Sequence, residues 1–232
     1  MPPLADIASN LTDVRRRIQA AAHKVHRSSS EITLVAVSKT FSADAIRIAV
    51  SAGQLVFGEN RVQEAVEKIS DLQGLGIAWH LIGHLQSNKA RRAAADFDCI
   101  ESVSSVDVIQ KLDRGAEGLG KRPRILVQVD LAREPTKHGV PESELGAVIA
   151  SALDARSLDL VGLMIVPPYD EDPEASRVWF QRLRHLRDRL VAGGVPPARL
   201  VHLSMGMSHD FEVAIEEGAT MVRVGTAIFG RR

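Results

Sequence analysis

The segment ITLVAVS, residues 32–38, is an apolar run of strand length that leads directly into Lys39. A helical pattern follows it over residues 43–52, and a second apolar run begins at Leu55. Apolar runs of four to eight residues that alternate with stretches of 3.6-residue periodicity are typical of βα units around a parallel sheet. The alternation continues along the rest of the chain, so the number of runs predicts the architecture.

We expect eight strands, at Ile32–Ser38, Leu55–Gly58, Ala78–Gly83, Cys99–Ser102, Ile125–Asp130, Leu158–Met164, Leu200–Ser204 and Met221–Gly225. Helical patterns lie between them at 43–52, 61–72, 87–95, 106–118, 142–154, 173–191 and 209–217, and one more precedes the first strand at 4–26. Eight strands with intervening helices in 232 residues predict an α/β fold, a (β/α)8 TIM barrel. An open doubly wound sheet is the structural alternative, which the uninterrupted repeats disfavour.

The repeats also predict the domain organisation. No stretch rich in Gly, Ser or Pro interrupts them, so we expect a single domain over residues 1–232. Only residues 226–232 follow the last expected strand, which is too short for a full eighth helix. We therefore expect the extra N-terminal helix, 4–26, to cover the gap beside strand eight.

The charge and cysteine content exclude several classes of protein. Lys and Arg total 29 and Asp and Glu total 29, so the chain lacks the basic excess that gives nucleic-acid and anionic-membrane binding proteins their affinity. The single cysteine, Cys99, forms neither an intramolecular disulfide nor a cysteine-based zinc site. The first residues show no secretory signal, and no apolar run approaches the ~18 residues of a membrane span. We therefore expect a cytoplasmic protein without nucleic-acid or membrane partners.

Two residues at strand ends are candidates for chemistry, because the reactive groups of such barrels lie at the carboxyl ends of the strands. Lys39 follows strand one directly. A lysine at the mouth of an apolar barrel is partly desolvated, which favours the neutral amine that forms a Schiff base with an aldehyde or ketone. A solvated lysine that ends a strand is the structural alternative. Asn60 follows strand two, where it is placed to cap the next helix with Gln63 completing a capping box, and such a cap can also contact a ligand.

Two histidines near strand three, His80 and His84, raise the question of a metal site. Residues four apart on a strand are separated by roughly 13 Å at ~3.3 Å per residue, which is too far for one zinc ion with bonds of ~2 Å. We therefore predict no metal site. We expect His80 to line the barrel and His84 to lie in a loop.

Small and hydroxyl-bearing residues mark the ends of strands seven and eight. Ser204 and Ser208 belong to the first, and Gly225 and Thr226 to the second, where a very short helix begins. The loops after strands seven and eight, with the N-terminus of a short extra helix, form the usual phosphate site of such barrels. Tight turns without a ligand are the structural alternative.

Arg223 is a separate signal in strand eight. Val222 and Val224 share one face, so the strand alternation turns Arg223 toward the barrel interior. An inward guanidinium is costly unless a group accepts its hydrogen bonds. A ligand, Asp130 at the end of strand five, or another carboxylate are the candidate acceptors.

A reactive lysine, a phosphate-binding turn and an inward arginine together describe a site for pyridoxal 5′-phosphate (PLP), which carries an aldehyde, a phosphate and a pyridine ring. The relevant stretches are, in chain order, VSKT (37–40), FGEN (57–60), WHLIGHLQSNK (79–89), GLMIVPP (162–168), SMGMS (204–208) and RVGTAIFG (223–230). In these stretches the chain closely resembles the pyridoxal phosphate homeostasis proteins, which look like single-domain relatives of the alanine racemase N-terminal barrel. The resemblance covers nearly the whole chain in order.

The resemblance implies both a set of residues and a function. The implied cofactor contacts are Lys39 as the covalent aldimine, Asn60 beside the cofactor, Ser204, Ser208, Gly225 and Thr226 at the phosphate, and Arg223 at the pyridine nitrogen. The family is regarded as binding and buffering PLP and as influencing vitamin B6 and amino-acid balance, with no established turnover. This implies PLP as the small-molecule partner and PLP-dependent apo-enzymes as recipients, and we expect a monomer.

The inward arginine also bears on catalysis. Arginine is always charged and only donates hydrogen bonds, so Arg223 facing the pyridine nitrogen would keep it unprotonated and weaken the ring as an electron sink. This favours storage over chemistry at a substrate Cα. Alanine racemases share this arginine but add a tyrosine from a further domain, whereas the one tyrosine here, Tyr169, is expected in a loop. A slow PLP-dependent racemase or related enzyme is the alternative function.

A nucleic-acid or protein-binding module is a third class. It would use the basic segments 89–92 and 121–124 and the arginines of helix 173–191. Apolar residues recur along that helix at the spacing of a core stripe, so we interpret its arginines as a solvated face.

Overall fold

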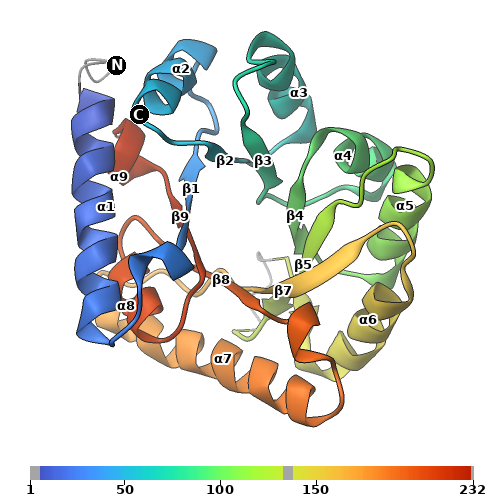
Figure 1. Cartoon of the computed structure of the whole chain (residues 1–232). Coiled ribbons are helices and arrows are strands. Elements are labelled where there is room, and N and C mark those ends of the chain that lie inside the picture. The colour runs from blue at the N-terminus through green and yellow to red at the C-terminus, as the bar shows by residue number, and fades with distance from the viewer. Residues whose placement is uncertain (1–5, 133–137, 231–232) are drawn as a thin grey trace.

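Eight parallel strands close into a barrel in the computed structural model, which describes residues 6–132 and 138–230 (Figure 1). The barrel strands are β1 (Thr33–Val37), β2 (Val56–Glu59), β3 (Ala78–Leu81), β4 (Cys99–Val103), β5 (Arg124–Asp130), β7 (Asp159–Met164), β8 (His202–Met207) and β9 (Met221–Val224). Their order is β4-β3-β2-β1-β9-β8-β7-β5, and pairing of β4 with β5 closes the ring. The predicted TIM barrel is confirmed, and this closure rules out the open sheet.

One further strand was not expected from the sequence. β6 (Val140–Pro141) has two residues and pairs with Val129 and Asp130 at the end of β5. It lies outside the closed ring and leads into the next helix. Two residues are too few to show a periodic pattern, so the sequence carries no signal for it.

Helices surround the barrel, and they follow the predicted ranges closely (Figure 1). They are α2 (Ala43–Ser51), α3 (Val62–Asp71), α4 (Ala90–Asp96), α5 (Val106–Ala116), α6 (Glu142–Asp154), α7 (Arg177–Ala192), α8 (Phe211–Glu216) and the short α9 (Thr226–Phe229). Serine caps define two of the starts, since the Ser42 and Ser105 side chains accept hydrogen bonds from backbone N–H groups of the first helical turn. Helix α4 follows a 3-10 turn at Ser87–Lys89, and α7 follows one at Pro173–Ser176. In the described part of the chain, every helix falls short of the combined length and apolarity that crossing a membrane requires.

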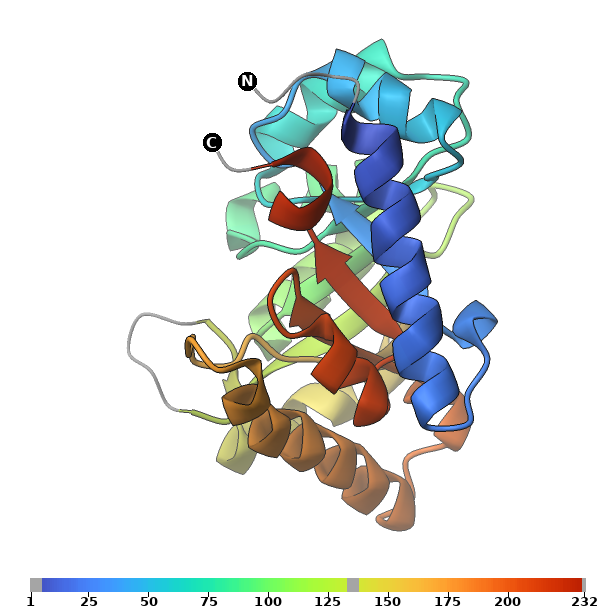
Figure 2. The same cartoon turned by 90° about the vertical axis from the view of Figure 1, so that its left-hand side faces the viewer.

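The first helix, α1 (Asp6–Lys24), fills the place of a long eighth helix. Figure 2 shows it running along α8, β9 and α9 on the outside of the barrel. The Asn10 side chain donates a hydrogen bond to the Ile228 carbonyl at 2.9 Å, and Arg17 pairs with Glu212 at 2.6 Å. The expectation that the N-terminal helix lies beside strand eight is therefore confirmed, although residues 4 and 5 of the predicted helix lie outside the described residues.

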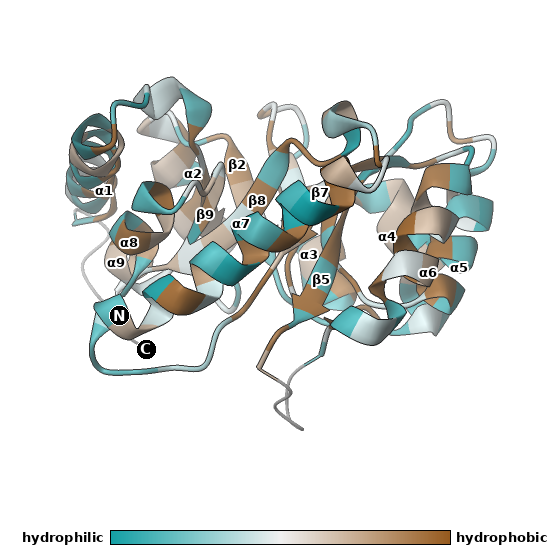
Figure 3. Ribbon diagram, turned by 90° about the horizontal axis from the view of Figure 1, so that it is seen from below, coloured by the Kyte–Doolittle hydropathy of each residue, from teal (hydrophilic) through white to brown (hydrophobic). Residues whose placement is uncertain are grey.

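The strands are apolar on both faces because both faces are buried. Leu34 and Ala36 of β1 belong to the large core between the barrel and its helices. Leu126, Met164 and Met221 form a second cluster with Cys99, from positions that alternate with the first set, and this cluster fills one part of the barrel interior. In Figure 3 the hydrophobic colour follows the strands and the inner sides of the helices, whereas the outer helix faces are hydrophilic.

Candidate functional site

The candidate site lies at the carboxyl ends of four strands that are neighbours in the barrel, in the order β2, β1, β9 and β8. The predicted residues are distributed over these ends as Asn60 after β2, Lys39 after β1, Arg223, Gly225 and Thr226 in or after β9, and Ser204 and Ser208 in or after β8. Parallel barrel strands place their carboxyl ends at one mouth. The fold thus brings together residues from both halves of the chain.

Lys39 is half-buried in the turn that leaves β1. The neighbouring strand β9 pairs with β1 so that Val35 lies opposite Arg223. A Cβ atom on Gly225 would lie 3.3 Å from the Cβ of Val37, which is a tight contact. The absent side chain of Gly225 therefore lets the end of β9 lie against β1, two residues before Lys39.

Ser208 lies where two backbone N–H groups converge. Its Oγ accepts hydrogen bonds from the N–H of Gly225 at 3.1 Å and from the N–H of Ala227 at 3.3 Å. Phosphate oxygens accept hydrogen bonds from donors of the same kind. The position beside the Ser208 hydroxyl therefore suits an oxygen of a phosphate group.

A β-bulge separates Ser208 from the strand before it. The pairing of β8 with β9 shifts register between Ser204 and Met207, and Gly206 in this interval has a φ of +92°. A Cβ on Gly206 would lie 2.5 Å from the Cβ of Ala214, so both the backbone conformation and the space require glycine. The bulge leaves Ser204 directed into the barrel and turns Ser208 toward the end of β9.

Arg223 lies inside the barrel, as its alternation with two valines predicts, and only 4% of it is exposed. Its guanidinium donates to the Ser204 Oγ at 2.5 Å and to the Ile165 carbonyl at 2.8 Å. The Ser204 hydroxyl in turn donates to Oε2 of Glu101 at 2.5 Å. Burial lowers the pKa of Arg223, and the negative charges of Glu101 and Asp210 oppose that shift. The acceptor of the inward guanidinium is thus a hydroxyl backed by a carboxylate, and the carboxylate is Glu101 rather than Asp130.

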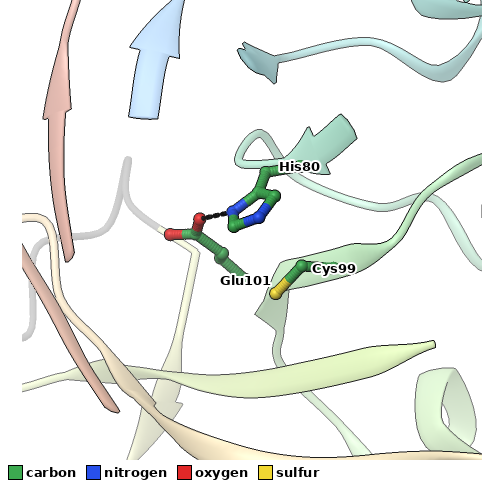
Figure 4. Close-up of side chains that lie close together, drawn as sticks. All are labelled: His80, Cys99 and Glu101. Atoms are coloured by element: carbon green, nitrogen blue, oxygen red, sulfur yellow. Dashed lines mark hydrogen bonds and ion pairs between the residues drawn. The ribbon is translucent and has the colours of Figure 1, made fainter. Parts of the chain in front are cut away.

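Glu101 joins Arg223 to a buried histidine. His80 Nδ1 lies 2.6 Å from Oε1 of Glu101, and both side chains are within 1% of complete burial (Figure 4). Burial alone would raise the pKa of the Glu101 carboxyl, but the hydrogen bond with His80, the charges of His80 and Arg223, and the Ser204 hydroxyl together lower it. An ionised carboxylate only accepts hydrogen bonds, so Nδ1 of His80 is the donor. His80 lines the barrel as predicted.

His80, Cys99 and Glu101 place ligand-type atoms within 4.8 Å of one another, an arrangement that could in principle hold a metal ion (Figure 4). Both oxygens of Glu101 already accept hydrogen bonds, one from His80 and one from Ser204. Burial, and then the charge of Glu101, raise the pKa of the Cys99 thiol well above its ordinary value, which disfavours the thiolate that binds metals. These contacts favour a positioning network around Arg223 over a metal site.

The lowered pKa of Glu101 predicts how stability depends on pH. A carboxyl whose pKa is lower in the folded than in the unfolded protein stabilises the fold above its ordinary pKa of 4.5, and this contribution is lost as the pH falls through the folded-state value. We expect Glu101→Gln to be less stable than wild type by about 1–3 kcal/mol at neutral pH. The difference should shrink below pH 4.5, as urea unfolding of both proteins at several pH values will show. A difference that is constant or grows on acidification contradicts the assignment.

Comparison with known proteins places these residues in a family. The model of the alanine racemase N-terminal domain matches residues 9–232. The pyridoxal phosphate homeostasis protein of Escherichia coli strain K12 is 42% identical over 233 residues, which cover 98% of this chain and 97% of that protein. This chain belongs to the pyridoxal phosphate homeostasis protein family.

Solved structures agree with the family assignment. The structure of PipY from Synechococcus elongatus PCC7942 with PLP bound is 39% identical and has a TM-score of 0.86, covering 97% of this family member and all of that chain (100%). Alanine racemase from Corynebacterium glutamicum has a TM-score of 0.75 at 18% identity, with 99% of this chain and 62% of the racemase covered. At that identity the similarity shows a shared barrel fold.

Asn60 in this family member does not cap the following helix, contrary to the expectation from its position. Helix α3 begins at Val62 with Arg61 as its N-cap residue, and no side-chain capping hydrogen bond is made. The Asn60 backbone instead lies directly against Gly83, where a Cβ would come within 2.3 Å of the Asn60 carbonyl oxygen. The loops after β2 and β3 cross at this point, and their contact decides the local geometry in place of a capping box.

Two glycine substitutions, one at this crossing and one at an open position of a helix, are expected to have opposite effects on stability. Gly83→Ala should destabilise the protein by about 1–3 kcal/mol, because the added methyl group meets the Asn60 backbone and not a flexible side chain. Gly146→Ala, in helix α6 with nothing within 4 Å of the added atom, should stabilise it by about 0.5–1 kcal/mol. Urea unfolding measures both, and equal stabilities for the two variants contradict this account.

Several charged residues around Arg223 and around the turn after β1 are not singled out by the sequence patterns. Glu101 falls within an expected strand without a predicted role, although a carboxylate within an apolar strand signals a buried partner. Glu59 at the end of β2, and Glu64 and Lys68 in α3, likewise carry no predicted role. The partners of Glu101 and Glu59 lie in other elements, so the chain shows only a charged residue where burial is expected. Glu64 and Lys68 are four apart on one helix, a spacing at which opposite charges pair. Tyr169 is 78% exposed in the loop after β7, as predicted.

Proposed function

We propose that this family member binds PLP at the barrel mouth, holds it as a Schiff base on Lys39 and serves PLP homeostasis in the cytoplasm without turnover of its own. Residues 1–232 then form one PLP-binding domain. The observation that carries this proposal is the placement of Lys39, Arg223 and the Gly225 and Ala227 N–H groups at the adjoining ends of β1, β9 and β8. The PLP bound in the related PipY structure supports it.

The residues at these three strand ends fit the three parts of the cofactor. When bound, PLP supplies an aldehyde carbon to which the Lys39 amine adds with loss of water. The N–H groups of Gly225 and Ala227 converge on the Ser208 hydroxyl, so a phosphate oxygen would take the place of this hydroxyl at the two N–H groups, with the hydroxyls of Ser208 and Thr226 as further donors. Arg223 would face the pyridine nitrogen, with Asn60 beside the ring. The Ser204 hydroxyl already contacts Arg223 and Glu101, so we assign it to orienting Arg223.

The same residues argue for storage over catalysis. A guanidinium that only donates hydrogen bonds keeps a facing pyridine nitrogen unprotonated, which weakens the ring as an electron sink. Racemisation further needs an acid or base on the opposite face of the substrate. The one tyrosine of the chain, Tyr169, is 78% exposed and its ring lies 5.8 Å from that of His209. This placement does not suit a buried proton donor.

Titration of the full-length protein with PLP tests the proposal. We expect a visible absorbance band that borohydride bleaches, and peptide mass spectrometry of the reduced protein should locate the adduct on Lys39. Absence of the band, or an adduct on another lysine, overturns the proposed linkage. If the loaded protein racemises alanine above the rate of PLP alone, the no-turnover part of the proposal is wrong.

We further propose that the protein is a monomer and passes PLP to PLP-dependent apo-enzymes. The loaded protein should then reactivate such an apo-enzyme faster than PLP released from it into solution can account for. Reactivation at the rate of free PLP contradicts transfer, and a dimer mass in light scattering contradicts the monomer.

A further inference from the structure

Both peptide groups that flank the Cα atom of Lys39 are held by side chains of helix α3. Lys68 Nζ donates to the Ser38 carbonyl at 2.8 Å, and this carbonyl belongs to the peptide bond before Lys39. The backbone N–H of Thr40, which belongs to the peptide bond after Lys39, donates to Oε1 of Glu64. Lys68 and Glu64 pair with each other at 2.9 Å across one helical turn. The two residues of one ion pair therefore form hydrogen bonds with the backbone on both sides of Lys39.

A second carboxylate completes the arrangement behind the turn. Glu59 is fully buried, and its Oε1 accepts from Lys68 at 2.8 Å and from the Ser38 hydroxyl at 2.6 Å. Lys68 itself is 8% exposed, and its ammonium group lies between the buried Glu59 and the partly exposed Glu64. Burial raises the pKa of Glu59. Burial also acts to raise the pKa of Glu64, but the hydrogen bonds from Lys68 and from the Thr40 N–H outweigh it, so the pKa of Glu64 is lowered. Burying charges costs free energy and is tolerated where geometry is required.

The turn held in this way adopts a backbone conformation that its sequence does not favour. Thr40 has a φ of +68°, which is uncommon for a residue other than glycine and unfavourable for a β-branched one. Such a conformation persists only when its surroundings impose it, and it is found mainly at functional sites. Two contacts hold it: the Thr40 N–H donates to Glu64, and the Phe41 N–H donates to the Ser38 carbonyl at 3.0 Å and closes the turn.

We propose that Glu64 and Lys68 form a backbone clamp that orients the Lys39 amine toward the aldehyde of the cofactor, with Glu59 orienting Lys68. They are positioning residues, because their hydrogen bonds are made to the peptide groups on either side of Lys39. This inference rests on the proposed function. A purely structural ion pair that fastens α3 to the barrel is the competing explanation, and it predicts a different pattern of effects.

The test compares two ligands on four variants of the full chain. PLP can react with Lys39, whereas pyridoxine 5′-phosphate has the same ring and phosphate but an alcohol in place of the aldehyde. We expect Glu64→Ala and Lys68→Met to weaken PLP binding by about 10-fold or more, one decade being about 1.4 kcal/mol, while pyridoxine 5′-phosphate binding changes by less than about 2-fold. Glu64→Gln keeps an acceptor for the Thr40 N–H and should lie near wild type. Glu67→Gln, an exposed carboxylate on the same helix, is the matched control.

A double-mutant cycle makes the route through Lys39 explicit. In a Lys39→Ala background, Glu64→Ala should cause no further loss of PLP affinity, because the residue that the clamp orients is already gone. Equal weakening of both ligands, or a further loss in the Lys39→Ala background, overturns the clamp and supports the structural explanation. Glu64 is partly exposed, so its variants test the idea even if Lys68→Met does not fold.

Hydrogen exchange in the cofactor-free protein separates failure of the clamp from failure of the proposed function. The Thr40 amide should exchange faster in Glu64→Ala than in wild type and in the Glu67→Gln control. If wild type shows this protection but forms no absorbance band with PLP, the proposed function fails while the backbone clamp stands. If the Thr40 amide exchanges equally in all three proteins, the clamp fails whatever the ligand does.

Discussion

Replacing Lys39 by alanine is expected to abolish the visible band that PLP forms with the protein and the adduct that borohydride traps. Lys39 is the lysine that directly follows β1. This strand lies between β2, which leads to Asn60, and β9, which contains Arg223. Loss of the covalent bond should lower PLP affinity by ~100-fold or more, which corresponds to about 2.7 kcal/mol. Absorbance titration and equilibrium dialysis measure the two quantities.

Two further variants isolate the cause of that loss. Lys39→Arg keeps the positive charge but does not form a stable Schiff base, so it should also lack the band. Lys111→Ala removes a lysine that pairs with Asp107 on helix α5, which does not belong to the strand ends that form the site. This variant should behave as wild type. Pyridoxine 5′-phosphate should bind Lys39→Ala within about 3-fold of wild type if the phosphate and ring contacts are independent of the lysine. A retained band in Lys39→Ala contradicts the proposed linkage.

Replacing Arg223 by methionine is expected to destabilise the cofactor-free protein by about 3–5 kcal/mol, because the change removes a buried positive charge that stabilises the ionised Glu101 carboxylate. Methionine fills a similar length without a charge or a donor. The Ser204 hydroxyl and the Ile165 carbonyl would also lose their donor inside the barrel. Urea unfolding measures the change in the free energy of unfolding.

The companion variant tests whether the cost arises from the unpaired charge. Arg223→Met combined with Glu101→Leu should be more stable than Arg223→Met alone, since both buried charges are then removed. Arg114→Met, an exposed arginine on α5, should change stability by less than about 0.5 kcal/mol. If Arg223→Met is as stable as that control, the hydrogen bonds and charges around Arg223 do not stabilise the fold as predicted.

The barrel could be predicted because its signals are local. Each strand and helix is recorded in the periodicity of about ten consecutive residues, and the order of alternation leaves few topologies. The capping role predicted for Asn60 was wrong for a related reason. A capping box is a local pattern, but the contact of Asn60 with Gly83 brings together two loops that the chain separates by helix α3 and strand β3.

The positions of Lys39, Arg223 and Gly225 at strand ends were determined by the sequence alone, because strand ends in a parallel barrel meet at one mouth whatever the side chains are. The partners of these residues were decided by tertiary structure. Arg223 meets Ser204 across 19 positions of the chain, and Ser204 meets Glu101 across 103. Such contacts depend on strand register, on the bulge at Gly206 and on how α3 packs against β1 and β2. A hydrogen bond requires placement within a fraction of an ångström, and only the packed fold sets distances between distant residues that finely.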